Sequence, residues 1–156
     1  MNVRRLQPGD RAQWEELWQG YLDFYEHQLD AATTDHTWHS FFVDDSLVVG
    51  LGAFEDDDLV GICHLVMHAS TWSVSPYCYL NDLFVRSDCR TRGVGRTLIS
   101  AASEEARVAG ASKIYWQTHT DNATARRLYD QVAGNFGFIV YESELDDGQT
   151  TFSTPV

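Results

Sequence analysis

The feature that most constrains the fold of this chain is a predicted strand that leads through an arginine-rich turn into a predicted helix, within residues 79–98. Residues 79–85 are mainly aromatic and aliphatic with few breakers, which favours a strand. After the turn, apolar residues recur at helical spacing at Val94, Leu98 and Ala102. The stretch therefore predicts one strand–turn–helix unit at the centre of the fold.

The turn has the composition of an anion site. It contains the spacing Arg-x-x-Gly-x-Gly and four arginines, namely Arg86, Arg90, Arg92 and Arg96, and within it only Asp88 opposes them. Glycines at a helix start allow a ligand to approach the backbone. The first helical N–H groups have no intrahelical partner and lie at the positive end of the helix dipole. These properties predict a diphosphate-binding turn.

Two other phosphate-binding motifs are excluded by the residues present. A P-loop requires Gly followed by Lys, and no glycine of this chain precedes a lysine. A dinucleotide fingerprint requires a third glycine three residues after Gly95, where the chain has Leu98.

The acidic composition bears on the partners that the chain can bind. The net charge is −12, from 23 acids and 11 bases, which argues against non-specific nucleic-acid binding. Such a charge favours cationic small molecules or basic peptides, and it is equally consistent with plain solubility or a salty cytoplasm. We expect no membrane span and no secretory signal. Three cysteines without Cys-x-x-Cys spacing predict reduced thiols in a cytoplasmic protein.

The periodicity along the rest of the chain predicts one α/β domain over residues 1–156, with a mixed sheet. The other expected strands are 3–6, 47–54, 59–67, 113–118, 138–145 and 150–153. The expected helices are 12–26, capped by Asp10, then 36–42, 93–109 and a fourth through 133, capped by Asp121 or Asn122. His64 and His68 share a strand face, but we expect no metal site because no third ligand is evident.

The end of the first predicted helix combines aromatic and acidic residues. Phe24 and Tyr25 lie beside Asp23 and Glu26 in the sequence, and Tyr21 precedes them by about one helical turn. Aromatic rings and carboxylates together favour a bound ammonium group. We therefore predict that Tyr21, Asp23, Phe24 and Glu26 contact a substrate amine, and we include Asn81 of the central strand among the substrate-binding residues.

The strand–turn–helix unit resembles the acetyl-CoA motif of the GNAT N-acetyltransferase superfamily. The resemblance covers most of the chain, because a second block of that superfamily is also present. It reads Ile114-Tyr115-Trp116-Gln117, Asn122, Ala125, Leu128-Tyr129 and Gly137-Phe138. The run Leu-Asn-Asp-Leu-Phe-Val and the Trp-rich first helix resemble the polyamine, diamine and small histone-acetyltransferase-like bacterial branch. The resemblance implies a mixed, mostly antiparallel central sheet flanked by about four helices.

The resemblance also implies the cofactor and its residues. Acetyl-CoA is expected at Leu83, Phe84, Val85, Arg90, Thr91, Arg92, Gly93, Val94, Gly95, Arg96, Thr97, Asn122, Ala125 and Tyr129. A backbone N–H from residues 83–85 can polarise the thioester carbonyl. Tyr129 is the expected general acid for the sulfur, since a phenol stays protonated at neutral pH.

The base that removes the amine proton stays open between two sets of carboxylates. Asp82 is nearest the reacting strand, whereas Glu26 and Asp23 could act through water. Strand alternation puts Asn81 and Asp82 on opposite faces unless a bulge intervenes. Polyamine acetyltransferases of this type have Glu where this chain has Asn81, and the segment from Tyr129 to Gly137 is longer than usual.

These observations predict an N-acetyltransferase that moves an acetyl group from acetyl-CoA to a primary amine of a cationic acceptor by direct attack. The acceptor classes are a polyamine, a lysine-like small molecule or a basic peptide. An aminoglycoside acceptor, or a non-catalytic acyl-CoA-binding sensor or interaction module, is the alternative. The resemblance alone further predicts a homodimer that exchanges contacts through residues 138–153.

Overall fold

The computed structural model describes residues 1–145 and 150–151 of the chain. The chain divides into two compact units, Met1–His119 and Thr120–Val156, and each is described by itself. The single domain expected over residues 1–156 stays a prediction.

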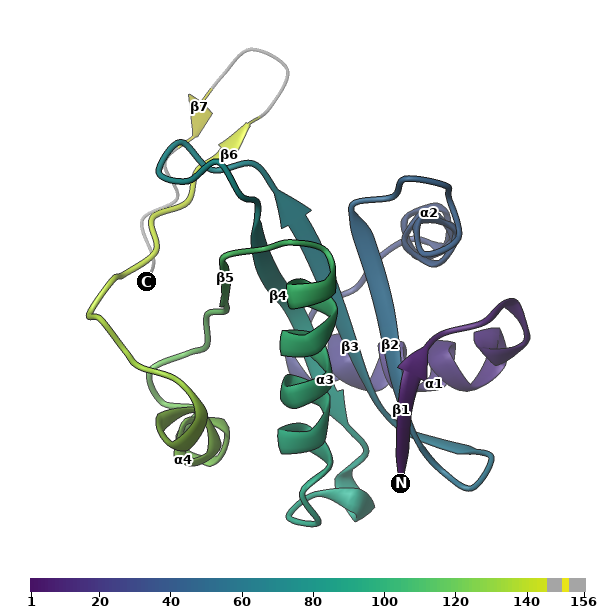
Figure 1. The fold of residues 1–156 in the computed structure, drawn as a ribbon. Helices are drawn as coiled ribbons and strands as arrows, with labels where there is room; N and C mark the ends of the chain where they lie inside the picture. The colour runs from purple at the N-terminus through teal and green to yellow at the C-terminus, as the bar shows by residue number, and fades with distance from the viewer. Residues whose placement is uncertain (146–149, 152–156) are drawn as a thin grey trace. The chain divides into compact units, whose positions relative to one another are not determined.

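The first unit is built on a five-stranded sheet in the order β1-β2-β3-β4-β5 (Figure 1). The strands are β1 (Asn2–Arg5), β2 (Val48–Glu55), β3 (Asp58–His68), β4 (Tyr77–Val85) and β5 (Lys113–Tyr115). Neighbouring strands are antiparallel except β4 and β5, which are parallel. The mixed, mostly antiparallel sheet predicted from the sequence is therefore confirmed, although β5 ends three residues earlier than expected.

Helices cover both faces of this sheet. They are α1 (Arg11–Phe24), α2 (Ala31–Ser40) and α3 (Val94–Val108), with short 3₁₀ turns at Pro8–Asp10 and Ser87–Cys89. Helix α3 lies on one face, and α1 and α2 lie on the other (Figure 1). A Cβ at Gly61 of β3 would lie 3.0 Å from Leu98 and 3.1 Å from Val94, so this glycine allows α3 to approach the strand closely.

The face under α1 and α2 is packed with aromatic rings. Trp14 is fully buried and stacks on Trp18 at 5.8 Å, and its ring centroid lies 4.9 Å from that of Trp38. Leu17 and Leu22 of α1 and Ile62 of β3 complete the cluster. The aromatic spacing of the first helix therefore marks its core-facing side, as predicted.

Two helix starts differ from the sequence prediction. Helix α2 begins at Ala31, not His36, because the side chain of Asp30 accepts a 2.7 Å hydrogen bond from the Thr33 N–H. Asp10 does not cap α1 with its side chain, since its carboxylate binds the Arg4 guanidinium and the Gln7 N–H instead.

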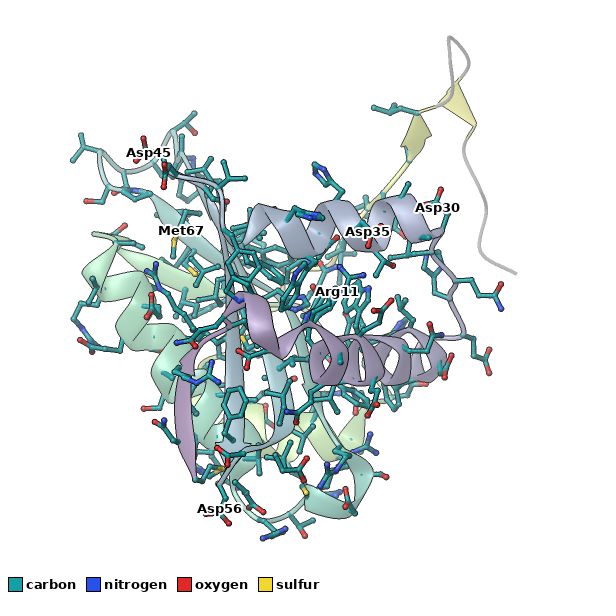
Figure 2. The ribbon with its side chains drawn as sticks, turned by 90° about the vertical axis from the view of Figure 1, so that its right-hand side faces the viewer. Arg11, Asp30, Asp35, Asp45, Asp56 and Met67 are labelled. Atoms are coloured by element: carbon teal, nitrogen blue, oxygen red, sulfur yellow. The ribbon has the colours of Figure 1, made fainter. Side chains whose placement is uncertain are left out.

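An ion pair joins α1 to α2. Arg11 of α1 lies 2.7 Å from Asp35 of α2, and the two residues are neighbours in Figure 2, which also shows Asp30 at the start of α2. The pair connects the two helices at an exposed position, where an ion pair contributes little to the free energy of unfolding.

The second unit contains α4 (Ala123–Val132) and two-residue strands at Glu144–Leu145 (β6) and Thr150–Thr151 (β7). The side chain of Asn122 caps α4 by accepting the Ala125 N–H, as predicted. The strand expected over residues 138–145 is wrong for 138–143, which have no regular structure. A strand needs a hydrogen-bonded neighbour, and in the described residues only 144–145 have one. Of the predicted strand 150–153, the last two residues lie outside the described residues.

Candidate active site

One edge of β4 is open over its second half. The pairing of β4 with β5 covers only Tyr77–Tyr79, so in the described chain residues 80–85 have β3 on one side and no strand on the other. Backbone groups on such an edge can bind an extended ligand as an added strand. One of them is already used, because the Arg90 Nε donates a 3.1 Å hydrogen bond to the Val85 carbonyl.

The turn that follows β4 presents backbone N–H groups at the start of α3. Thr91 and Gly93 both have positive φ, 66° and 86°, and a Cβ at Gly93 would meet nothing within 4 Å. The Thr97 N–H bonds the Gly93 carbonyl at 3.0 Å, so the N–H groups of residues 94–96 precede the first intrahelical bond. This geometry fits a bound diphosphate.

The arginines of the turn are more fully paired than the sequence suggested. Arg86 binds Asp58 at 2.9 Å as well as Asp88 at 2.8 Å, and Arg92 binds Glu55 at 2.9 Å. Glu55 and Asp58 come from the β2–β3 hairpin, which is distant in sequence. The acidic residues of this hairpin thus partly balance the positive charge of the turn. The backbone N–H groups would therefore contribute a larger share of the free energy with which the turn could bind an anion.

A β-bulge at Asn81 determines which β4 side chains share a face. His64 pairs with Asp82, but the next residue, Leu65, pairs with Leu80, which leaves Asn81 as the extra residue. Regular alternation would put Tyr79 and Asp82 on opposite faces. The bulge turns both to the face covered by α1, while Asn81 is exposed.

Asp82 is the centre of a buried hydrogen-bond network. Its carboxylate lies 2.9 Å from Nδ1 of His64, and the Trp14 indole N–H donates to Nε2 of the same ring at 2.9 Å. The Tyr21 hydroxyl and Asn81 also hydrogen-bond the carboxylate. Asp82 is 7% exposed, so a ligand that reaches the strand edge can still touch it.

Electrostatics at Asp82 favour a negative charge. Burial acts to raise the pKa of Asp82, but the hydrogen bonds from His64, Tyr21 and Asn81 lower it overall. Burial and the nearby Asp82 charge raise the pKa of Tyr21, Tyr25 and Tyr79. At neutral pH the site therefore holds a carboxylate among protonated phenols.

The structure divides the predicted substrate residues into two groups. Tyr21 and Asn81 contact Asp82. Asp23 and Glu26 are exposed, and Asp23 accepts a bond from Gln19 of its own helix.

Phe24 lies near the arginine-rich turn, because the Arg90 guanidinium lies 5.9 Å from the centre of its ring. Sequence reasoning missed His64, Trp14, Tyr25 and Tyr79 as neighbours of Asp82. Only Tyr25 carried a signal, since it follows Tyr21 by one helical turn.

The remaining predicted residues belong to the second unit. Asn122 caps α4, and Ala125 supplies the N–H that its side chain accepts at 3.3 Å. Tyr129 is half-buried, and α4 has no fully buried residue.

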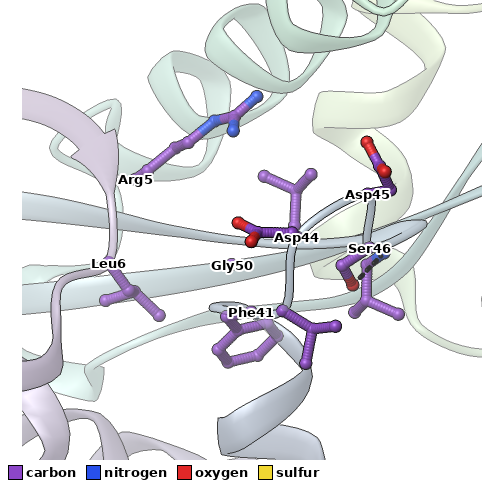
Figure 3. A pocket seen from close by; sticks show the side chains of 10 residues that line it. Arg5, Leu6, Phe41, Asp44, Asp45, Ser46 and Gly50 are labelled. Atoms are coloured by element: carbon purple, nitrogen blue, oxygen red, sulfur yellow. Dashed lines mark hydrogen bonds between the residues drawn. The ribbon is translucent and has the colours of Figure 1, made fainter.

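A cavity of about 330 Å³ lies at the opposite edge of the sheet and contains none of the predicted site residues (Figure 3). It is lined mainly by residues 43–50 with Arg5, Leu6 and Phe41. The charged side chains of Arg5, Asp44 and Asp45 are among those that line the cavity.

Comparisons with known proteins agree with this geometry. The model of the Acetyltransferase (GNAT) family matches residues 12–134. The chain is 30% identical over 142 residues to the D-amino-acid N-acetyltransferase HPA3 of Saccharomyces cerevisiae, covering 90% of this chain and 88% of that protein. It is 32% identical over 90 residues to the thialysine N-epsilon-acetyltransferase of Caenorhabditis elegans, covering 58% and 56% respectively.

A solved structure has the same fold. An aminoglycoside acetyltransferase from an uncultured soil metagenomic sample, in complex with sisomicin, superposes with a TM-score of 0.79 at 16% identity, covering 93% of this chain and 96% of that one. The family model and the N-acetyltransferase relatives define an acyltransferase that uses a coenzyme A thioester. The chain belongs to the Acetyltransferase (GNAT) family, and it is an acetyl-CoA-dependent N-acetyltransferase. In the part of the chain that is described, no helix has the length and hydropathy of a membrane span.

The lowered pKa of Asp82 makes a prediction about stability. A folded-state pKa below the unfolded value of about 3.9 contributes stability that is present above that pH and is lost as the pH falls through the folded pKa. Asp82→Asn should therefore lower the free energy of unfolding at neutral pH, and the difference from wild type should shrink as the pH falls below the unfolded value of about 3.9. Urea unfolding across this range checks it, and a difference that is independent of pH would contradict it.

Proposed function

We propose that this enzyme acetylates the primary amine of a cationic acceptor, and that the acceptor binds beside Asp82. The acceptor classes are a polyamine, a lysine-like small molecule or a basic peptide. One observation carries the proposal: a nearly buried carboxylate lies among Tyr21, Tyr25 and Tyr79 on the face that the bulge creates. Aromatic rings attract an ammonium group, and a carboxylate of low exposure has a strong preference for a cationic partner.

The names of the relatives support an amino-acid-like acceptor. One acts on D-amino acids and the other on thialysine, so each has an amine substrate with an ammonium group at neutral pH.

The donor is proposed to bind along the open β4 edge and the turn. Acetyl-CoA supplies the acetyl group as a thioester. Leu83, Phe84 and Val85 offer backbone groups to its extended arm, and residues 90–97 offer N–H groups and arginines to its diphosphate. Asn122 and Ala125 are proposed to contact the cofactor, as the resemblance implies.

Two side chains are proposed to move protons. The bound ammonium group first releases one proton to water, which leaves the neutral amine that attacks the thioester. Asp82 orients this amine and takes up the second proton, which the nitrogen loses as it is acylated and becomes strongly acidic. A backbone N–H from residues 83–85 polarises the carbonyl. Tyr129 donates its phenol proton to the sulfur.

The preference of the acceptor site for cationic amines is tested with a panel of amines. Thiol release from acetyl-CoA is measured with polyamines, lysine, D-amino acids, a basic peptide and an aminoglycoside. Asp82→Asn should raise the KM of the preferred cationic amine more than that of acetyl-CoA. Asp23→Asn and Glu26→Gln should have smaller effects because both side chains are exposed. If Asp82→Asn changed the KM of both substrates equally, the acceptor would have to bind elsewhere.

The diphosphate turn is tested with a pair of matched glycine variants. Gly93→Asp places a negative charge at the start of α3, and acetyl-CoA affinity should fall roughly tenfold. Gly110→Asp makes the same change at the other end of α3, where φ is also positive (76°) and a Cβ again has open space, so affinity should not change. Calorimetry compares them, and equal affinities would reject the assignment of the turn.

The role of Tyr129 is tested by removing one oxygen. Tyr129→Phe keeps the ring, so the melting temperature should change little, while kcat falls about 10²–10⁴-fold. Acetyl-CoA affinity should change little, since one neutral hydrogen bond contributes about 0.5–1.5 kcal/mol. Tyr141→Phe, at a tyrosine that is 88% exposed, is the control. Wild-type kcat across pH in Tyr129→Phe would eliminate the proton-donor role.

We also propose a homodimer and a cytoplasmic location. The exposed apolar run Phe136, Phe138, Ile139, Val140 and Tyr141 supports the dimer, with Phe138 at 90% exposure. The free cysteines Cys63, Cys78 and Cys89 support the location. Light scattering should give the mass of two chains.

Variants of the exposed run sharpen the dimer test. Phe138→Asp should shift the mass to one chain, because it places a charge in the proposed contact. Trp72→Asp changes an equally exposed ring in another loop and should leave the mass unchanged. A monomeric wild type at micromolar concentration would reject the dimer.

A further inference from the structure

A directed chain of hydrogen bonds runs from α1 through β3 to β4. The Trp14 indole N–H donates to Nε2 of His64, and Nδ1 of His64 contacts the Asp82 carboxylate. The distance between the two heavy atoms is 2.9 Å in both contacts. Trp14 is 0% and His64 2% exposed. The imidazole also packs against Trp18 and Phe41, with ring centroids 5.2 and 4.9 Å away, so it is held in one orientation.

The chemistry of Trp14 fixes the proton on His64. An indole N–H can only donate, so Nε2 accepts and the ring proton lies on Nδ1, where it is donated to Asp82. A doubly protonated ring would set its own Nε2–H against the indole N–H. Each hydrogen bond in the chain therefore donates toward Asp82.

We propose that Trp14 and His64 are positioning residues, which hold Asp82 as an ionised carboxylate in a single orientation toward the acceptor amine. The inference rests on the proposed function, in which Asp82 receives that amine. It adds that the histidine beside the site is a locked donor and not the base. The proton lost by the acylated nitrogen goes to a carboxylate oxygen of Asp82 and leaves to water with the product.

The other titratable groups near Asp82 stay protonated in the range where the carboxylate titrates. They are Tyr21 of α1, Tyr25 directly after α1 and Tyr79 of β4, together with Cys63, which precedes His64 in β3. Burial and the Asp82 charge raise the pKa of each of them. A titration seen at Asp82 in acid thus reports the carboxylate and its bond to His64.

The first test observes the proton directly in the wild-type protein. With ¹⁵N-labelled histidine, the ring signals of His64 are identified by their loss in His64→Asn. We expect Nδ1 protonated and Nε2 unprotonated at neutral pH. A ring that carries its proton on Nε2 would overturn the proposal.

The second test removes the links of the chain one at a time. His64→Leu removes the hydrogen bond that His64 donates to the buried Asp82 carboxylate, and kcat/KM for the acceptor should fall roughly 10–100-fold. Asparagine carries an amide nitrogen on the same Cγ that carries Nδ1 in histidine. His64→Asn should therefore recover most of the loss. The KM of acetyl-CoA should stay unchanged in both variants.

Two tryptophan variants separate positioning from packing. Trp14→Phe removes the indole N–H, and Trp38→Phe removes a ring of the same size from the same cluster. Both should lower the melting temperature. Only Trp14→Phe should lower kcat/KM for the acceptor and raise the midpoint of the Asp82 carboxyl titration, followed by ¹³C NMR. Equal changes in the two variants would reduce Trp14 to a packing role.

The readouts distinguish the two levels of the proposal. If the wild-type enzyme acetylates no cationic amine, the proposed acceptor is wrong, while the ring tautomer and the Asp82 midpoint still decide the positioning. If folded His64→Leu and Trp14→Phe proteins leave that midpoint in place, the positioning is wrong even where acetyl transfer is normal.

Discussion

A buried carboxylate must be hydrogen-bonded, and much of the first unit is arranged to satisfy Asp82. Desolvation of an ionised carboxyl group costs more free energy than a single neutral hydrogen bond returns. Here α1 supplies Tyr21, β3 supplies His64, and α1 supplies Trp14 behind it. Loss of one donor leaves the charge uncompensated, so the aromatic packing under α1 and the ionisation of Asp82 depend on each other.

The bulge in β4 makes this arrangement possible. A regular strand would point Tyr79 away from Asp82, and the phenols of α1 would then face the carboxylate without a partner from the strand. One extra residue, Asn81, brings Tyr79 and Asp82 to the same face and leaves the residues beyond them on an edge without a second neighbour in the described sheet. The bulge thus places Tyr79 beside Asp82 at the point where the pairing of β4 with β5 ends.

The features that were predicted correctly from the sequence depend on local residue patterns, and those that were missed depend on residues far apart in the chain. The strand–turn–helix unit, the Asn122 cap and the core side of α1 follow from periodicity and capping chemistry. The bulge has no residue signature, so Tyr79 could not be assigned to the face of Asp82. The strand expected after Phe138 failed because apolar alternation shows that a strand can form and not that a partner is present. The links from His64 to Trp14 and Asp82 join positions 50 and 18 residues apart, beyond any local motif.

The charge of the cofactor turn shows the same difference between local and distant information. Counted along the chain, residues 86–96 are strongly basic, yet Glu55 and Asp58 of the β2–β3 hairpin neutralise part of that charge. An exposed arginine that is already paired gains less from a new anion than an unpaired one. The backbone N–H groups at the start of α3 cannot be neutralised in this way, because their orientation is fixed by the helix and by Gly93. The geometry of the turn, more than its count of arginines, therefore supports the proposal that it binds an anion.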